Sequence, residues 1–383
     1  MTGIYPLIGT VKHYDWGGFS FIPHLLKQDN SGRQPFAEYW LGTHILGMGK
    51  LENGELLKSL TGELSFLLKA QDVHQMLSIQ VHPSKAEAEK DFARENEAGI
   101  PLQAPHRNYK DPNHKPEMLV AQSDFWLLHG FKPAEQLTDI LMNVAELQEL
   151  LPYFTTGGYE ALYRYIMEMP QEEVERILQP LLKNIPAIYD DRPPQRDEED
   201  YWADRAARQF DASGKTDRGI FSVYLLNLVH LKKGEGLFQG AGLPHAYLEG
   251  QCVEIMANSD NVLRGGLTTK HIDIPELMKH VRFEPTYPRI LSGERAAGGE
   301  ERLYPAPVPD FRLGCFDIPA GGKASFTPAG PELLLLTAGR VRAKAGDTEM
   351  LLEPGRPSAI VFPGATVQLE ADAHTLLFRA SGM

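Results

Sequence analysis

Residues 332–379 read "ELLLLTAGRVRAKAGDTEMLLEPGRPSAIVFPGATVQLEADAHTLLFR", and this stretch decides the fold class. Short apolar runs such as "ELLLL", "EMLLE", "AIVF" and "TLLFR" follow one another at intervals of about eight to twelve residues, separated by Gly, Pro and Asp turns. That spacing is typical of a β-sandwich or jelly roll. We therefore predict that residues 285–383 form a C-terminal jelly roll of about eight strands.

A second β-rich zone is predicted from two separate parts of the chain. Residues 1–131 contain short strand-like runs such as "MLSIQVHP" (76–83) and "PEMLVAQS" (116–123). Strand-like sequence returns at Gly219 in "GIFSVYLLNLVHL" and continues through "QCVEIMA" (251–257). We expect residues 1–131 and 219–284 to form one discontinuous jelly roll. Ser84 and Glu87 make a capping-box pattern and Gly99 stands at a helix end, so a charged, solvated helix is expected between them.

The intervening segment, residues 132–218, has the periodicity of helices. Apolar residues recur at the three-and-four spacing of one buried helix face, first from Leu137 to Leu151 and again from Val174 to Leu182. Pro180 is expected to kink the second helix. The fold is thus predicted to be mainly β, with two jelly rolls and a helical insertion domain.

Composition limits the function classes. The chain has 383 residues, 42% of them hydrophobic, and a formal net charge of −13. An acidic surface disfavours nucleic-acid binding, which needs a basic face. No apolar run approaches the ~18 residues of a membrane span, no signal peptide is recognised, and Cys252 and Cys315 cannot build a disulfide framework. We expect a cytoplasmic protein without membrane or nucleic-acid partners.

Three separate β segments offer metal-binding side chains. Gln80 and His82 alternate along one apparent strand and so share a face, Glu117 ends "KDPNHKPE" (110–117), and His245 lies in "GAGLPHAYLEG" (240–250). Each alone reads as an ordinary core or turn residue. Together they supply the three or four N/O ligands of a catalytic zinc site, and the single carboxylate would leave a site of net charge +1.

A fourth segment, "VEIMANSDNVLRGGLTTK" (253–270), combines charge with glycine. Arg264 stands in a Gly-flanked loop, Lys270 follows two threonines, and Glu254 and Asp260 precede them. Such a loop can bind an anion through guanidinium, ammonium and backbone N–H groups, although an ordinary charged hairpin has the same composition.

Five blocks resemble type I phosphomannose isomerase in their order and spacing: "YDWGG" (14–18), "LSIQVHPSK" (77–85), "KDPNHKPE", "GLPHAY" (242–247) and "NSDNVLRGGLT" (258–268). The resemblance covers roughly residues 5–285. It implies a cupin-type jelly roll that binds one zinc ion per chain, an inserted helical domain and a second jelly roll.

The resemblance also implies roles for single residues. Gln80, His82, Glu117 and His245 look like the zinc ligands. The acid/base group near the metal would come from Glu254, Lys115 and His114. The expected substrate-anchoring and pocket residues are Arg264, Asp260, Lys270, Tyr247, Trp16 and Ser78.

The reaction implied is the interconversion of mannose 6-phosphate and fructose 6-phosphate through an enediolate, by a monomer acting on a small sugar phosphate. Two other functions remain open on the sequence. A cupin-type metal dioxygenase would use several histidines and iron, which the Gln-x-His pair and the anion loop argue against. A non-catalytic sugar-phosphate sensor would keep the fold, but we expect it to have lost a ligand or the basic loop.

Overall fold

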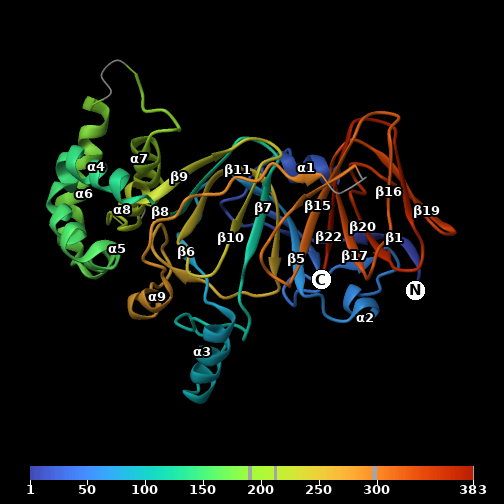
Figure 1. Cartoon of the computed structure of the whole chain (residues 1–383), viewed down its shortest axis with the longest axis horizontal. Coiled ribbons are helices and arrows are strands. Elements are labelled where there is room, and N and C mark those ends of the chain that lie inside the picture. Colours follow the sequence, from blue (N-terminus) through green and yellow to red (C-terminus); the bar gives the residue numbers. More distant parts are fainter. Residues whose placement is uncertain (189–191, 211–213, 296–299, 383) are drawn as a thin grey trace.

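The computed structural model describes residues 1–188, 192–210, 214–295 and 300–382. Three regions follow one another along the long axis of the molecule (Figure 1). Helices lie at one end, a β-rich region lies in the middle, and a β-sandwich lies at the other end together with both chain termini. Within the described residues, no helix has the length and apolar character needed to cross a membrane.

Strand β11 (His245–Ala257) organises the central region because it pairs on several sides. Its second half lies between β5 and β7, and its first half pairs with β6 and β8. The pairing with β8 shifts its register between Tyr247 and Glu249. One strand therefore carries His245 and Glu254 into the same interior. The other strands of this region are β2 (Thr10–Lys12), β3 (Glu38–Gly42), β5 (Phe66–Val73), β6 (Gln80–Val81), β7 (Glu117–Ala121), β8 (Phe125–Phe131), β9 (Leu226–Leu231), β10 (Gly236–Gln239) and β12 (Leu263–Arg264).

The helical insertion is confirmed, with one difference from the prediction. The first apolar face is divided among α4, η1 and α5, because Val144 has extended backbone angles and interrupts the helix. Pro180 lies inside helix α6, as predicted. The elements of this region are α4 (Ala134–Asn143), the 3-10 helix η1 (Ala145–Leu150), α5 (Leu151–Glu168), α6 (Gln171–Ile188), α7 (Glu199–Phe210) and α8 (Gly219–Leu225).

The strand expected from Gly219 onward is wrong in its first half. Residues 219–225 form helix α8, and β9 begins only at Leu226. Every residue of α8 is buried. A wholly buried helix has no polar face, so periodicity alone cannot distinguish its sequence from that of a buried strand.

The C-terminal sandwich is confirmed, and it contains one strand from the other end of the chain. Strand β1 (Gly3–Ile8), predicted to lie in the first jelly roll, pairs instead with β20 and β4 (Lys50–Leu51). The sandwich strands are β13 (Glu294–Arg295), β14 (Glu301–Tyr304), β15 (Arg312–Ile318), β16 (Lys323–Phe326), β17 (Glu332–Ala338), β18 (Val341–Ala345), β19 (Thr348–Leu352), β20 (Ser358–Phe362), β21 (Val367–Ala371) and β22 (Thr375–Ser381).

The two β regions share a hydrophobic core. Leu68 of β5 and Val253 of β11 belong to the same buried cluster as Leu333 of β17 and Phe378 of β22. Two short helices, α1 (Phe21–Leu26) and α2 (Leu57–Thr61), contribute Leu25 and Leu57 to that cluster. This common core fixes the sandwich against the central region.

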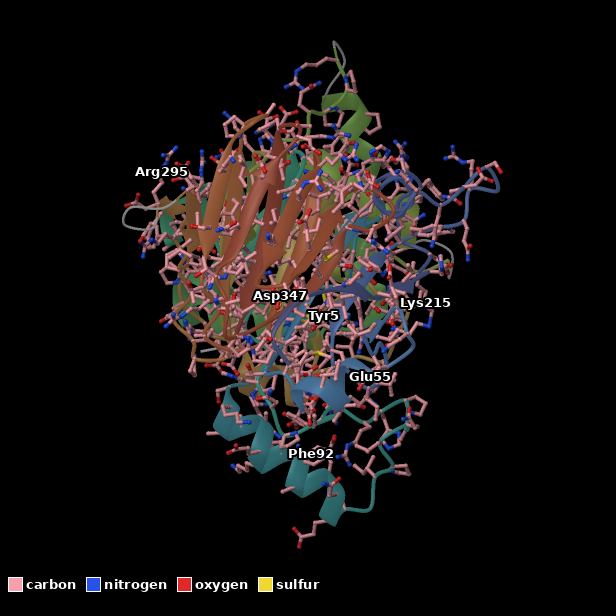
Figure 2. All side chains as sticks on the ribbon, turned by 90° about the vertical axis from the view of Figure 1, so that its right-hand side faces the viewer. Tyr5, Glu55, Phe92, Lys215, Arg295 and Asp347 are labelled. Atoms are coloured by element: carbon pink, nitrogen blue, oxygen red, sulfur yellow. The ribbon has the colours of Figure 1, made fainter. Side chains whose placement is uncertain are left out.

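Helix α3 (Lys85–Glu97) projects away from the body of the molecule, where Phe92 marks it (Figure 2). Its predicted start is confirmed, since the Ser84 side chain accepts from the Glu87 N–H and the Glu87 carboxylate accepts from the Ser84 N–H. Most of its residues are exposed, as predicted, but Asp91 and Glu95 are buried.

A polar network ties α3 to α9 (Ile274–His280). The Tyr109 hydroxyl donates to Glu276 Oε1 over 2.7 Å and lies 2.6 Å from His280 Nε2, and Arg94 Nη2 donates to Glu276 Oε1 over 2.7 Å. Asp91, Glu276 and His280 lie close enough to share an ion. The Tyr109 hydroxyl and Arg94 already satisfy these carboxylates, so the network needs no metal.

The charge of His280 should make the stability of this junction depend on pH. Burial alone would lower the pKa of His280, but the hydrogen bond to Glu276 and the charge of Glu87 raise it above the ordinary value of 6.5. A raised pKa in the folded state stabilises the protein fully below about pH 6.5, and this stabilisation is lost as the pH rises through the folded-state value.

We predict that His280→Gln lowers the free energy of unfolding more at pH 6 than at pH 9, as measured by denaturant titration at both pH values. His106→Gln, at an exposed position, is the control and should leave the pH dependence unchanged. An equal loss at both pH values would contradict the charge argument.

Candidate metal centre

Two histidines and one glutamate converge in the interior of the central region. His82 Nε2 lies 3.4 Å from Glu117 Oε1, and His245 Nε2 lies 3.2 Å from Glu117 Oε2. His82 follows β6, Glu117 begins β7 and His245 begins β11, so three strands bring them together. All three side chains are buried, and their ligand atoms lie within 4.8 Å of one another. The structure thus brings together three of the four predicted ligands.

The orientation of both imidazoles suits a cation. His82 Nδ1 lies 2.8 Å from the carbonyl of Asn261, and His245 Nδ1 lies 2.9 Å from the carbonyl of Leu243. A carbonyl only accepts, so each Nδ1 carries the proton and each Nε2 presents a lone pair toward Glu117. His82 Nε2 is buried without a hydrogen-bond partner. Lone pairs that face a carboxylate repel it unless a positive ion lies between them.

Burial and charge set the ionisation states of these groups. Burial lowers the pKa of His82 to about 4, although Glu117 opposes the shift, so the imidazole is neutral at neutral pH. Burial would raise the pKa of Glu117, but the charge of Lys115 holds it well below its usual value. Two imidazoles that each present an Nε2 lone pair and one carboxylate are a donor set that fits a divalent ion such as zinc.

Gln80, the fourth predicted ligand, lines a cavity together with Glu117 and His245. It pairs with His245 of β11 on one side and with Arg264 of β12 on the other. The cavity has a volume of about 60 Å³, and Lys69, Lys115, Tyr247 and Glu254 also line it.

A buried hydrogen-bond network that the sequence analysis missed lies beside the three ligands. Lys69 Nζ lies 3.0 Å from Glu254 Oε2 and 3.5 Å from Glu38 Oε1. Gln71 Nε2 donates to both carboxylates over 2.9 Å. The signal was present in β5, "FLLKAQDV", where Lys69 and Gln71 alternate in a mostly apolar strand and so share one face.

The network shifts the pKa values of Lys69 and Glu254. Burial would lower the pKa of Lys69, but Glu254 and Glu38 raise it, so the ammonium is charged. Burial raises the pKa of Glu254 and the charge of Glu117 adds to the shift, although the charge of Lys69 opposes it. Tyr247, predicted to line the pocket, donates its hydroxyl to Glu254 Oε1 over 2.7 Å.

The three predicted acid/base candidates occupy different positions. Lys115 lines the cavity with its Nζ 3.1 Å from Glu117 Oε1, and Glu254 lines the cavity within the Lys69 network. His114 is not among the residues that line the cavity. Its Nε2 lies 2.9 Å from Asp310 Oδ2, in the loop between β14 and β15 of the C-terminal sandwich. The structure therefore groups Lys115 and Glu254 and places His114 outside the group.

Of the predicted anion-binding residues, Arg264 pairs in the sheet with Gln80, which lines the cavity. Arg264 is half-buried, and no described carboxylate lies within ion-pair distance of it; burial lowers its pKa. Burial and the charge of Arg264 lower the pKa of Lys270. Asp260 Oδ2 lies 3.3 Å from Nε2 of His44, a second residue that the sequence analysis missed. Burial would raise the pKa of Asp260, but His44 lowers it.

Trp16 and Ser78, also predicted to line the pocket, are half-buried but do not line the 60 Å³ cavity. Trp16 stacks on Tyr14. Trp16 and Leu77, which does line the cavity, both pack against the buried cluster that contains Tyr247.

A larger cleft of about 520 Å³ lies in the C-terminal sandwich. Its buried charges are already paired, because Arg379 Nη1 donates to Glu301 over 2.9 Å and Nη2 donates to Glu332 over 3.0 Å. Size alone therefore does not identify the functional site, and the converging ligands do.

Comparisons with known proteins agree with this assignment. The sequence profile of the type I phosphomannose isomerase catalytic domain matches residues 4–134. The mannose-6-phosphate isomerase of Escherichia coli K12 is 34% identical over 378 residues, covering 92% of this chain and 94% of the relative. The human mannose-6-phosphate isomerase is 31% identical, covering 98% of each chain.

Solved structures extend the similarity to the whole fold. The Salmonella typhimurium mannose 6-phosphate isomerase bound to fructose 6-phosphate and zinc has a TM-score of 0.86 and 33% identity, and 99% of both chains is covered. The apo form of the Salmonella typhimurium enzyme has a TM-score of 0.88 over 100% of both chains. These similarities show that the chain belongs to the type I phosphomannose isomerase family, and the cluster of His82, Glu117 and His245 agrees with this membership.

Proposed function

We propose that this protein is a zinc-dependent isomerase that interconverts mannose 6-phosphate and fructose 6-phosphate. The observation that carries the proposal is the convergence of His82, Glu117 and His245 on one buried point, with Gln80 in the same cavity. The family membership and the zinc- and fructose 6-phosphate-bound Salmonella structure support it.

His82, Glu117, His245 and Gln80 would hold the zinc ion. When bound, zinc supplies a Lewis acid that stabilises negative charge on the sugar oxygens at C1 and C2. Glu117 is the only carboxylate of this ligand set, so a net positive charge would remain for that purpose. The burial of all three ionisable ligands strengthens the electrostatic effect, because it is weakly screened there.

Lys115 is the residue that we propose to move the proton. Its ammonium group lines the cavity beside Glu117, whereas both Glu254 oxygens already accept hydrogen bonds from Tyr247, Lys69 and Gln71. Beside the bound cation, Lys115 would give up its ammonium proton to solvent, and the neutral amine would take the proton from C2 of the aldose. The hydroxyl proton on O2 would pass to O1, and Lys115 would return its proton to C1 of the enediolate, which yields the ketose. Glu254 and Lys69 would form the part of the cavity wall that contacts the reacting carbons.

Arg264 and Lys270 are proposed to bind the 6-phosphate. A half-buried guanidinium without a carboxylate partner among the described residues is costly unless an anion compensates it. Binding energy at the phosphate can hold the reacting end of the sugar in place.

The substrate is small and the chain carries a net charge of −13, so we further propose a cytoplasmic monomer with no nucleic-acid or membrane partner. Size-exclusion chromatography with light scattering would test the monomer.

The metal proposal predicts one tightly bound zinc ion per chain. Chelation should abolish mannose 6-phosphate isomerisation in a coupled assay, and Zn²⁺ should restore it. His82→Ala or His245→Ala should lose metal and activity together, measured by elemental analysis and the same assay. Circular dichroism should stay β-rich, because the strands do not depend on the ion. His374→Ala, at an exposed position of the sandwich, is the control; full activity in metal-free protein would refute the proposal.

The phosphate proposal predicts a specific loss in Arg264→Ala. A buried charge-assisted hydrogen bond is worth about 1.5–3 kcal/mol, so kcat/KM for mannose 6-phosphate should fall at least about tenfold. Free mannose should be a poor substrate for both proteins. Arg282→Ala, which removes an exposed arginine of the following segment, should have no such effect. Equal turnover of mannose and mannose 6-phosphate by the wild type would contradict the assignment.

The proton-transfer proposal predicts that Lys115→Ala lowers kcat by about 10²–10⁴-fold. In D₂O the wild type should place some deuterium at C1 of fructose 6-phosphate, detected by mass spectrometry. His114→Ala should retain most of the activity, because His114 lies outside the cavity. If Lys115→Ala, Glu254→Gln and His114→Ala each turned over at the wild-type rate, a hydride shift would be the better mechanism.

A further inference from the structure

The loop before Glu117 and the loop before Arg264 are joined through the side chain of Asn261. Asn261 Oδ1 accepts from the backbone N–H of Lys110 over 2.7 Å and of Asp111 over 3.3 Å. Asn261 Nδ2 donates to the carbonyl of Asp111 over 2.7 Å and to that of Asn113 over 2.8 Å. The side chain is buried, so one amide satisfies four backbone groups of residues 110–113 away from water.

The backbone of Asn261 contacts a metal ligand directly. Its carbonyl accepts the proton of His82 Nδ1 over 2.8 Å, and this bond fixes both the tautomer and the ring orientation of His82. One residue therefore orients a ligand through its main chain while its side chain holds the loop that leads to Lys115 and Glu117.

The loop of residues 110–113 in turn binds the loop that contains Asn261, and these bonds in both directions make the junction rigid. The Asp111 carboxylate accepts from the Asp260 N–H over 2.8 Å and from the Ser259 hydroxyl over 2.8 Å. It also accepts from the N–H of Asn113 over 2.9 Å. Each loop thus fixes the backbone of the other with its own side chain.

We infer that Asn261 is a positioning residue that holds the His82 imidazole and the Lys115–Glu117 segment in the geometry required to bind the metal. The inference rests on the proposed function, since it concerns the ion that His82 and Glu117 would hold.

Asparagine is the side chain that this position requires. Alanine would leave four backbone groups of the 110–113 loop without their partner. Aspartate has the same shape but no donor, so it would face the carbonyls of Asp111 and Asn113 with an anion. The Asp111 carboxylate, whose Oδ1 lies 3.3 Å from Asn261 Nδ2, would then face a like charge. In either variant the Asn261 carbonyl that accepts from His82 Nδ1 would shift with the loop.

The test measures metal binding rather than turnover. Protein stripped of metal is titrated with Zn²⁺ against a chromophoric chelator, and the Co²⁺-loaded form is examined for its d–d absorption, which reports ligand geometry. We expect Asn261→Ala to weaken zinc binding about 10–100-fold and to change the Co²⁺ spectrum. Asn261→Asp should fold and shift both quantities in the same direction.

Asn227 provides a matched control. It is also buried, and its Nδ2 donates to the backbone carbonyls of His129, Phe131 and Thr286 over 3.0 Å each, but it touches no proposed ligand. Asn227→Ala should lower the thermal stability of the metal-free protein while its zinc affinity stays within about twofold of the wild type.

Wild-type zinc affinity and Co²⁺ spectrum in both Asn261 variants would overturn the inference. An equal loss of affinity in Asn227→Ala would also overturn it, because a general loosening would then explain the effect. A wild-type protein that binds zinc but does not isomerise mannose 6-phosphate would contradict the proposed function alone, because the comparison of affinities remains valid.

Discussion

Buried charge in the central region must be compensated, and the protein side chains alone do not balance it. Glu38, Glu117 and Glu254 are buried there, and among the residues that the structure describes only the ammonium groups of Lys69 and Lys115 lie within 3.5 Å of them. Three carboxylates and two ammonium groups leave one negative charge in a region where charge is expensive. A divalent cation bound there would make the net charge of this buried region positive. The position of the metal ligands, the raised pKa of Glu254 and the polar face of β5 all follow from this one constraint.

The parts of the site that the sequence predicts are those that belong to recognisable motifs. Gln80, His82, Glu117 and His245 stand at strand ends beside turns, where a polar residue in an apolar context is conspicuous. Lys69 was missed because it lies within a strand whose other residues are mostly apolar. Its partners Glu38 and Glu254 come from strands that the sequence does not show to be neighbours.

The same distinction explains the outcome for the fold. Sandwich, insertion and capped helix were predicted, because turn spacing, helical period and capping chemistry are local. Helix α8 was taken for a strand because all of its residues are buried. The pairing of β1 with β20 joins residues more than 350 positions apart, and no local pattern reports such a contact. The role of Asp310 beside His114 was hidden for the same reason.

The pairing of β1 also has a consequence for biosynthesis. The ribosome makes Gly3 more than 350 residues before its partner Phe362. At about 5–20 residues per second, β1 waits roughly 20–70 seconds before β20 exists. Co-translational folding can complete the helical insertion long before then, but the sheet that contains β1 closes only after β20 has left the ribosome. An unpaired strand edge is open to aggregation during that interval, so a nascent chain of this protein depends on protection of β1.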